Sequence, residues 1–346
     1  MGRKIAIVLF NLGGPNNRQA IRPFLKNLFS DPAIIRAPGP IRWALSELIS
    51  RLRAPAVAEN YAMMDAPGGG SPLLPETEKQ AAALESALDA RHPENTHKCF
   101  IAMRYWHPFT HEAAEAVAAW DADEIILLPL YPQFSSTTTG SSAKEWAEHS
   151  DLPVKTVCCY PLNDDLIIAH AQKIMSAWEE NGSPDRVHLL MSAHGLPERV
   201  VKDGDPYQWQ VEQMAAQLVP HLPDSWNTTV CYQSRVGPLK WIGPATEDVI
   251  EEASKAGEHI VVAPVAFVSD HIETLVELGE EYREVAEEFG AVGYINVPAL
   301  GTIDVFIKAL ADEVDAALAD DRSLRSCAGG RLCPKRWSDC PHAEPA

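Results

Sequence analysis

The sequence predicts an α/β protein made of two similar halves, each with a parallel β-sheet that helices cover on both faces. Three observations lead to this prediction. Short runs of aliphatic and β-branched residues recur along the chain, helix-length segments separate most of them, and two runs of one half resemble two runs of the other. Strands that are apolar on both faces and alternate with helices are typical of such sheets.

The expected strands are apolar runs at 4–15, 99–108, 124–136, 154–161, 186–197, 228–238, 259–271 and 291–300. The expected helices fill the intervals at 77–91, 110–120, 164–181, 206–220, 244–256, 272–289 and 302–319. Strands that alternate with helices in this way predict a doubly wound α/β architecture.

Two alignments indicate the internal duplication. "KIAIVLFNLGGP" (4–15) matches "RVHLLMSAHGLP" (186–197), and "IILLPLYPQFSS" (125–136) matches "IVVAPVAFVSDH" (260–271) with a proline at the same point. Generic strand composition is the alternative explanation of this likeness. We infer two Rossmann-like halves, with an insertion in the first.

The predicted organisation has three parts. They are a first half at 1–160 that includes an insertion at about 16–76, a second half at 161–320, and a cysteine-rich tail at 321–346. Ligands of such sheets bind beyond the carboxyl ends of the strands, so we expect the active site in the cleft between the halves.

Composition and charge exclude several classes of protein. The formal net charge of −19 argues against nucleic-acid binding, because phosphates would be repelled over most of the surface. No stretch approaches the roughly 20 apolar residues that span a bilayer, and the apolar run at the start is too short for a convincing signal peptide. We therefore expect a cytoplasmic protein whose seven cysteines are thiols or metal ligands.

The insertion is a basic region of an acidic protein. Residues 18–53 contain seven Lys or Arg and two acidic residues, interleaved with large apolar side chains. Three interpretations fit this pattern: a solvated helix pair, a lip that accepts a flat apolar molecule bearing carboxylates, or a surface that touches an anionic membrane.

The segment "SDHIETLVELGEEYREVAEEFG" (269–290) is expected to begin at a strand end and continue as a helix. Its glutamates share one helical face: Glu273, Glu277 and Glu280 or Glu281. With His194 and His271 at neighbouring strand ends, their oxygen atoms would suit a divalent transition metal that is held weakly enough to be released. The alternative is a solvated acidic face, which fits the outer glutamates best.

The tail carries three cysteines, Cys327, Cys333 and Cys340, in a Gly- and Pro-rich segment. A [2Fe–2S] cluster takes four cysteines, so one ligand would come from the body of the protein. The adjacent Cys158 and Cys159 are better candidates than the strand-interior Cys99 and Cys231. Structural zinc is the rival, bound by four thiolates or by three with His342.

Two further motifs bear on ligand binding. "MRYWHPFT" (103–110) joins a cation to aromatic rings, which suits a planar anionic ligand, although a half-buried aromatic turn explains it equally well. The Gly- and Ser-rich loops at 68–72 and 128–142 lack the P-loop pattern, and "NLGGP" lacks the dinucleotide spacing. Nucleotide binding is therefore weakly supported.

Taken together, the motifs resemble the ferrochelatase family in its order, from about residue 4 to residue 310. They are "LFNLGGP", "GGGSP", "MRYWHP", "LPLYPQFSSTTTGSS", "SAHGLP", "VCYQSRVGPLKWIGPAT" and "PVAFVSDHIETLVELGEEY". The resemblance implies a chelatase-like fold of two Rossmann-like halves with the porphyrin in the cleft. It also implies a lyase that inserts Fe²⁺ into protoporphyrin IX to give protohaem, in the last step of haem biosynthesis.

The resemblance carries roles to particular residues. His194 corresponds to a histidine that binds the incoming iron or accepts a pyrrole proton, and Glu273 corresponds to a glutamate opposite it across the cleft. The insertion corresponds to a lip that admits porphyrin. The other matches are an acidic relay of Asp270, His271 and Glu277 and a substrate-side pair of Arg104 and Tyr105.

The tail resembles that of bacterial ferrochelatases containing a [2Fe–2S] cluster. The body ligand of the animal form aligns with Ala169, so it is absent here, and Cys158 is the predicted fourth ligand, followed by Cys159. The alternative functions are a coproporphyrin ferrochelatase, a cobalt chelatase, a non-catalytic porphyrin or haem carrier, and a cluster-based redox protein. The sequence does not indicate an oligomeric state.

Overall fold

The computed structural model describes residues 2–64, 67–235 and 239–342. Part of the motif at 230–246 and the last four residues of the tail therefore lie outside the described residues. The chain forms two compact units. The first consists of Met1–Leu130, Ser135–Cys158 and Val314–Ser323, and the second of Tyr131–Phe134, Cys159–Glu313 and Leu324–Ala346.

The sheet of the first unit has the strand order β2-β1-β3-β4-β9. The bounds are β1 Lys4–Asn11, β2 Thr96–Met103, β3 Glu124–Pro129, β4 Lys155–Cys159 and β9 Leu324–Ser326. Strand β1 pairs in parallel with β2 on one side and β3 on the other, and all its residues after Lys4 are buried. A central parallel strand is covered on both faces, which explains its unbroken run of apolar residues.

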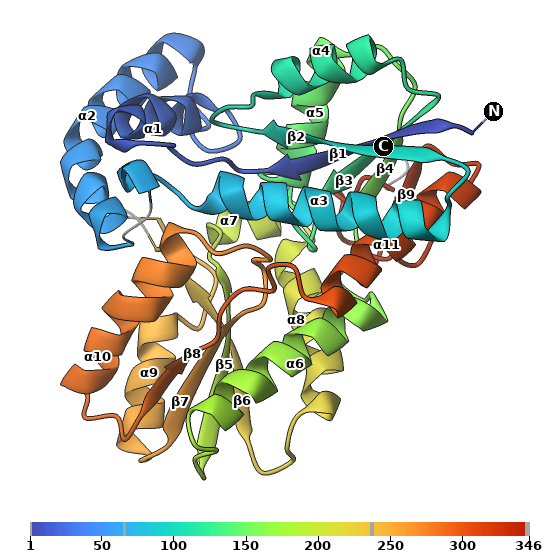
Figure 1. Cartoon of the computed structure of the whole chain (residues 1–346). Helices are drawn as coiled ribbons and strands as arrows, with labels where there is room; N and C mark the ends of the chain where they lie inside the picture. Colours follow the sequence, from blue (N-terminus) through green and yellow to red (C-terminus); the bar gives the residue numbers. More distant parts are fainter. Residues whose placement is uncertain (1, 65–66, 236–238, 343–346) are drawn as a thin grey trace. The chain divides into compact units, whose positions relative to one another are not determined.

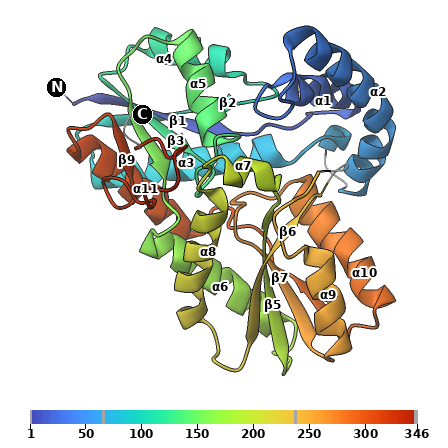
Figure 2. The same cartoon turned by 180° about the vertical axis from the view of Figure 1, so that it is seen from behind.

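Helices cover both faces of this sheet. Helix α3 (Leu73–Arg91) lies on one face, and α4 (Thr110–Trp120) and α5 (Thr139–His149) lie on the other (Figures 1 and 2). The insertion forms η1 (Arg18–Ala20), α1 (Ile21–Ser30), α2 (Gly39–Met63) and η2 (Pro67–Gly69), with α1 packed against α2. Helix α2 keeps large apolar side chains in contact with solvent: Ile41, Trp43, Leu48, Leu52 and Met63.

The sheet of the second unit has the strand order β6-β5-β7-β8 and is parallel throughout. The strands are β5 Val187–His194, β6 Asn227–Gln233, β7 His259–Pro264 and β8 Tyr294–Asn296. Figure 1 shows α9 (Thr246–Lys255) and α10 (Tyr282–Glu288) on one face, and α6 (Asp164–Glu180) and α8 (Tyr207–Leu218) on the other. The remaining helices are α7 (Glu198–Lys202), η3 (Val219–His221) and α11 (Asp304–Ala319).

Both sheets repeat one arrangement, which confirms the predicted α/β class with two parallel halves. The first strand of each half is central and pairs with two neighbours, β1 with β2 and β3 and β5 with β6 and β7. Pro129 ends β3 and Pro264 ends β7, in agreement with the second sequence alignment. None of the helices in the described part of the chain is long and apolar enough to cross a membrane.

The segment after β7 differs from the prediction of one α-helix that starts at a strand end near residue 270. The strand ends at Pro264, and residues Glu273–Glu281 form a π-helix, labelled η4, before α10 begins. In an α-helix the Thr274 carbonyl would accept from the N–H four residues later, but here the Asn296 amide donates to it (3.2 Å). The spacing of apolar residues does not distinguish this wider helix, because side chains outside the segment stabilise it.

Candidate active site and cysteine centre

The site is built around the carboxyl end of β5. His194 is the last residue of this strand and is in register with Gln233, the last residue of β6. The Nδ1 atom of His194 lies 2.9 Å from Oε2 of Glu273, the first residue of the π-helix. The His194 side chain is 39% exposed and that of Glu273 is 22% exposed, so solvent reaches the pair.

A second carboxylate lies next to this pair. Glu277 accepts hydrogen bonds from the backbone N–H of Ser234 (2.8 Å), from the Ser234 hydroxyl (2.5 Å) and from the Tyr282 hydroxyl (3.1 Å). The Gln233 amide lies between the two glutamates, 3.5 Å from Glu273 and 3.3 Å from Glu277. The turn after β6 therefore holds Glu277 beside Glu273.

The charges of the three groups affect one another. Burial opposes ionisation of Glu273, but the adjacent His194 outweighs it and lowers the pKa of Glu273 to about 2. Burial also opposes protonation of His194, yet Glu273 and then Glu277 raise its pKa above the ordinary value. Burial, followed by the charge of Glu273, raises the pKa of Glu277. The site thus combines a carboxyl group whose pKa is lowered, an imidazole whose pKa is raised and a second carboxyl group whose pKa is also raised.

The loop before the π-helix packs on this site. Phe267 lies edge-on to His194, with ring centroids 6.5 Å apart, and its ring is tilted by 50° against that of His271, with centroids 4.5 Å apart. Burial lowers the pKa of His271, and its Nδ1 has no hydrogen-bond partner among the described residues. Asp270 accepts from the Thr274 hydroxyl (2.9 Å) and from the Ala299 N–H (3.1 Å), so it fixes the start of the π-helix.

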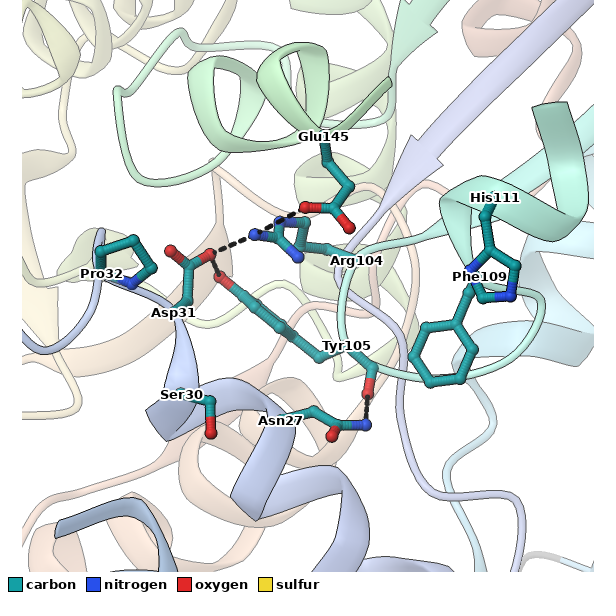
Figure 3. Close-up of a pocket in the computed structure, with 9 residues that line it drawn as sticks. All are labelled: Asn27, Ser30, Asp31, Pro32, Arg104, Tyr105, Phe109, His111 and Glu145. Carbon is teal, nitrogen blue, oxygen red and sulfur yellow. Dashed lines mark hydrogen bonds and ion pairs between the residues drawn. The ribbon is translucent and has the colours of Figure 1, made fainter. Parts of the chain in front are cut away.

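Arg104 and Tyr105 lie in the first unit, in the wall of a hollow of about 290 Å³ (Figure 3). The Arg104 guanidinium is 2.8 Å from Asp31 and 3.3 Å from Glu145, and the Tyr105 hydroxyl donates to Asp31 at 2.8 Å. Tyr105 is 1% exposed. Their polar groups therefore bind neighbouring side chains of this unit, and contact with a substrate stays a prediction for both.

Cys333 of the tail and Cys159 at the end of β4 both contact Gln210 of α8, in the second unit. The side-chain amide of Gln210 donates to Cys333 Sγ (3.1 Å) and to Cys159 Sγ (3.5 Å). The backbone N–H of Cys327 donates to the carbonyl of Cys159 at 3.0 Å. Successive strand residues point to opposite faces of a sheet, so Cys158 points away from the face of Cys159. These contacts thus bring Cys159 to the tail.

The fourth cysteine, Cys340, has a free thiol that contacts the thiol of Cys333 through a hydrogen bond. A hydrogen bond from Cys333 lowers the pKa of Cys340 to about 6, and the backbone of His342 and the charge of Arg331 act in the same direction against burial. The Arg331 guanidinium also donates to the Cys333 carbonyl at 2.9 Å. Among residues 2–64, 67–235 and 239–342, no three His, Cys, Asp or Glu side chains are grouped so as to hold a single metal ion.

Sequence reasoning missed three residues that contact the site: Gln233, Ser234 and Gln210. Gln233 and Ser234 carried a usable signal, because they are polar residues at the carboxyl end of a predicted strand, where ligands of parallel sheets bind. Gln210 carried none, since it is a buried residue in the first turn of a helix.

Comparison with solved structures identifies the class of fold. SirB from Bacillus subtilis, solved with Fe³⁺, aligns with a TM-score of 0.52 over 92% of this chain and 96% of its own length, at 10% sequence identity. DR2241 from Deinococcus radiodurans, a multi-domain protein with structural similarity to chelatases, aligns with a TM-score of 0.51 over 93% of this chain and 56% of its own length, at 14% identity. The fold is therefore chelatase-like.

Sequence comparison then gives the family. The ferrochelatase family model matches residues 4–318. A ferrochelatase of Hyphomonas neptunium is 61% identical over 99% of this chain and 96% of its own length, and one of Caulobacter vibrioides is 56% identical over 100% and 99%. The chain belongs to the ferrochelatase family. It is a lyase that inserts Fe²⁺ into protoporphyrin IX to give protohaem, in the last step of haem biosynthesis.

Proposed function

We propose that His194 and Glu273 form the point at which Fe²⁺ enters the porphyrin and the pyrrole protons leave. The observation that carries the proposal is the 2.9 Å contact between His194 Nδ1 and Glu273 at the carboxyl end of β5. Because Nδ1 is directed to the carboxylate, Nε2 is the nitrogen that is open to a substrate. Iron insertion requires loss of the ion's water and of two N–H protons, and it needs no nucleophile or electron transfer.

In this proposal His194, Glu273 and Glu277 each have a separate role. In its neutral form, His194 accepts a pyrrole proton through Nε2 or ligates the incoming iron, as histidine does in many proteins. Glu273 remains ionised at neutral pH, compensates the charge on His194 and offers oxygen atoms to Fe²⁺. Glu277, whose pKa is raised, takes up the proton next, and Asp270 and His271 complete the relay.

The test uses a matched pair on the same strand. His188, near the other end of β5, has its Nδ1 2.9 Å from Glu258 and thus forms an equivalent imidazole–carboxylate contact. We expect His194→Ala to abolish Fe²⁺ insertion while porphyrin binding, followed by fluorescence, persists. His188→Ala should retain turnover. Retained turnover in His194→Ala would remove His194 from the mechanism.

We propose that Cys159, Cys327, Cys333 and Cys340 hold a [2Fe–2S] cluster. Three buried thiols, a Cys340 pKa of about 6 and a Gln210 amide donor suit thiolate ligands, which this cluster requires. Four cysteines bind two irons in pairs and need not converge on one point, whereas zinc requires four ligands around one centre. When bound, the group supplies one-electron redox chemistry and a cross-link between the tail and the body.

Neighbouring cysteines provide the control for this proposal. Cys159→Ser should abolish the visible absorption of the cluster and lower the content of bound iron and sulfide. Cys158→Ser, on the opposite face of β4, should leave both unchanged. The reverse result would make Cys158 the fourth ligand, and stoichiometric zinc without sulfide would favour the zinc site.

We also propose that the insertion meets a membrane at the cytoplasmic face, in addition to admitting porphyrin. Trp43 is 62% exposed and Leu52 is 70% exposed on α2, a helix that also carries arginines. Apolar side chains with basic neighbours are typical of surfaces that bind anionic lipid. Trp43→Ser with Leu52→Ser should abolish sedimentation with phosphatidylglycerol vesicles, and an unchanged bound fraction would refute the contact.

A further inference from the structure

We propose that Gln233 is a positioning residue for iron insertion: Ser192 orients its side-chain amide, and the amide holds the two glutamates of the π-helix in place. The inference rests on the function proposed above for His194 and Glu273. Ser192 comes from β5, Gln233 is the last residue of β6, and all the groups concerned belong to the second unit.

Gln233 contacts both glutamates through one amide nitrogen. Its Nε2 atom lies 3.5 Å from Oε2 of Glu273 and 3.3 Å from Oε2 of Glu277. Oε2 of Glu273 also lies 2.9 Å from Nδ1 of His194, so the amide reaches the same carboxylate oxygen as the imidazole. A primary amide has two N–H donors, and each glutamate can accept one of them.

The two glutamates are held to different degrees. Glu277 accepts from the backbone and the hydroxyl of Ser234 and from the hydroxyl of Tyr282, which fix it to the turn after β6 and to the start of α10. Glu273 contacts His194 and Gln233. Neighbouring carboxylates repel each other, and a donor between them offsets the repulsion. Gln233 therefore connects Glu273 to the firmly held Glu277.

Ser192 sets the direction of this amide from the interior of the unit. Both Ser192 and Gln233 are fully buried, and the Ser192 hydroxyl donates to Oε1 of Gln233 at 2.8 Å. The opposite orientation would place the amide oxygen against two carboxylates, where it would be repelled. It would also remove the acceptor of the bond from Ser192. The serine thus favours the orientation that presents the N–H groups to the glutamates.

Strand geometry explains how Ser192 reaches the amide. Ser192 and His194 are two residues apart on β5 and so point to the same face, and His194 is in register with Gln233 on β6. Behind Ser192 lies Thr246, the first residue of α9, whose hydroxyl is 3.4 Å from that of Ser192 and donates to Cys231 Sγ at 3.4 Å. A buried chain of polar groups therefore leads from α9 to the carboxylates, and such chains specify one arrangement.

The expected consequence of breaking this chain is a loss of turnover that spares porphyrin binding. Without the amide, Glu273 is no longer connected to Glu277 and moves away from the position beside His194. We expect kcat for Fe²⁺ insertion to fall. The affinity for porphyrin should be unchanged, because Ser192 and Gln233 are fully buried and are not placed to contact it.

The experiment compares three single variants and one double variant. Gln233→Leu removes both N–H donors, whereas Ser192→Ala keeps the amide and removes only the group that orients it. Ser254→Ala is the matched control, because Ser254 is a buried serine of the same unit whose hydroxyl donates to the Ile250 carbonyl at 2.7 Å within α9. For each full-length protein we would measure kcat, KM for Fe²⁺, porphyrin affinity by fluorescence, and Tm.

Gln233→Leu should lower kcat about ten- to hundredfold, the range expected for a hydrogen bond to a charged group. Ser192→Ala should lower kcat about three- to tenfold, the range expected for a hydrogen bond between neutral groups. Ser254→Ala should match the wild type in kcat. The double variant of Ser192 and Gln233 should be no slower than Gln233→Leu, because Ser192 acts through Gln233.

Other outcomes would overturn the inference. Multiplied losses of kcat in the double variant would mean that Ser192 acts independently of Gln233. A wild-type kcat in Ser192→Ala with a lowered Tm would give the serine a structural role only, and a porphyrin affinity that falls together with kcat would contradict positioning. An unchanged kcat in Gln233→Leu would refute the inference and leave the roles of His194 and Glu273 intact, whereas retained turnover in His194→Ala would remove the function on which it rests.

Discussion

Replacing Glu273 by glutamine is expected to lower the pKa of His194 and to move the acid limb of the pH–rate profile to lower pH. Glutamine keeps the shape of the side chain and the oxygen that accepts from His194 Nδ1, so only the negative charge is lost. That charge lies 2.9 Å from the imidazole and raises its pKa. A neutral His194 is the form that accepts a pyrrole proton, so the wild type needs a higher pH to reach it.

The size of the shift follows from distance and exposure. The nearby negative charge raises the pKa of His194, and the 39% exposure of its side chain weakens the effect because solvent screens the charges. Two unit charges 2.9 Å apart attract each other by about 1.4 kcal/mol at the dielectric constant of water, and this attraction is lost in Glu273→Gln. Glu277 remains in place and prevents a larger change.

The assay follows His194 directly and through catalysis. The imidazole Cε1–H resonance of His194, assigned among the 12 histidines by its loss in His194→Ala, would be titrated in both proteins. The dependence of kcat/KM for Fe²⁺ insertion on pH would be measured alongside. An unchanged or raised midpoint in Glu273→Gln would refute the assignment of Glu273 as the charge that sets the pKa of His194.

Two further predictions concern stability. Burial lowers the pKa of His170 to about 3, so the free energy of unfolding should decrease as the pH falls from about 6.5 towards 3, by about 2 kcal/mol at pH 5. His170→Leu should remove this loss, as measured by urea unfolding at pH 5 and pH 7. Tyr105→Phe should lower stability by about 1–2 kcal/mol, because Asp31 loses a buried hydrogen bond, and should leave KM for porphyrin unchanged.

Each of these predictions has a control. The exposed His221, replaced by glutamine, should leave the pH dependence of stability unchanged, and an identical slope in His170→Leu would mean that other groups cause it. A raised KM in Tyr105→Phe without loss of stability would show that the hydroxyl contacts substrate, as the family resemblance implies for this residue.

The fold followed from the sequence because its determinants are periodic and local. Apolar strands that alternate with helices predicted two parallel sheets, and the aligned prolines correspond to Pro129 and Pro264 at the ends of β3 and β7. The π-helix did not follow. It depends on Asn296 and Tyr294, which bond carbonyls of the segment from a strand that follows it in the chain. Contacts of this kind do not appear in the spacing of apolar residues within the segment itself.

The candidate site was predictable only in part from the sequence. His194 and Glu273 were singled out by strand ends and by family motifs, and the structure brings them into hydrogen-bond contact. Their roles remain predictions. The choice between Cys158 and Cys159 could not be made from spacing, because adjacent residues of a strand differ only in the face to which they point. That difference became visible through Gln210, which contacts Cys159.

The π-helix makes the positions of the glutamates depend on the length of the chain as well as on its composition. Each of its hydrogen bonds encloses one residue more than in an α-helix, because it joins residues five apart instead of four. Deleting one residue between Glu273 and Glu277, such as Leu275, would allow an ordinary α-helix while retaining every carboxylate. The two glutamates could then no longer contact His194 and Ser234 together. Among natural or designed relatives, a single-residue deletion in this segment should therefore be less tolerated than most substitutions within it.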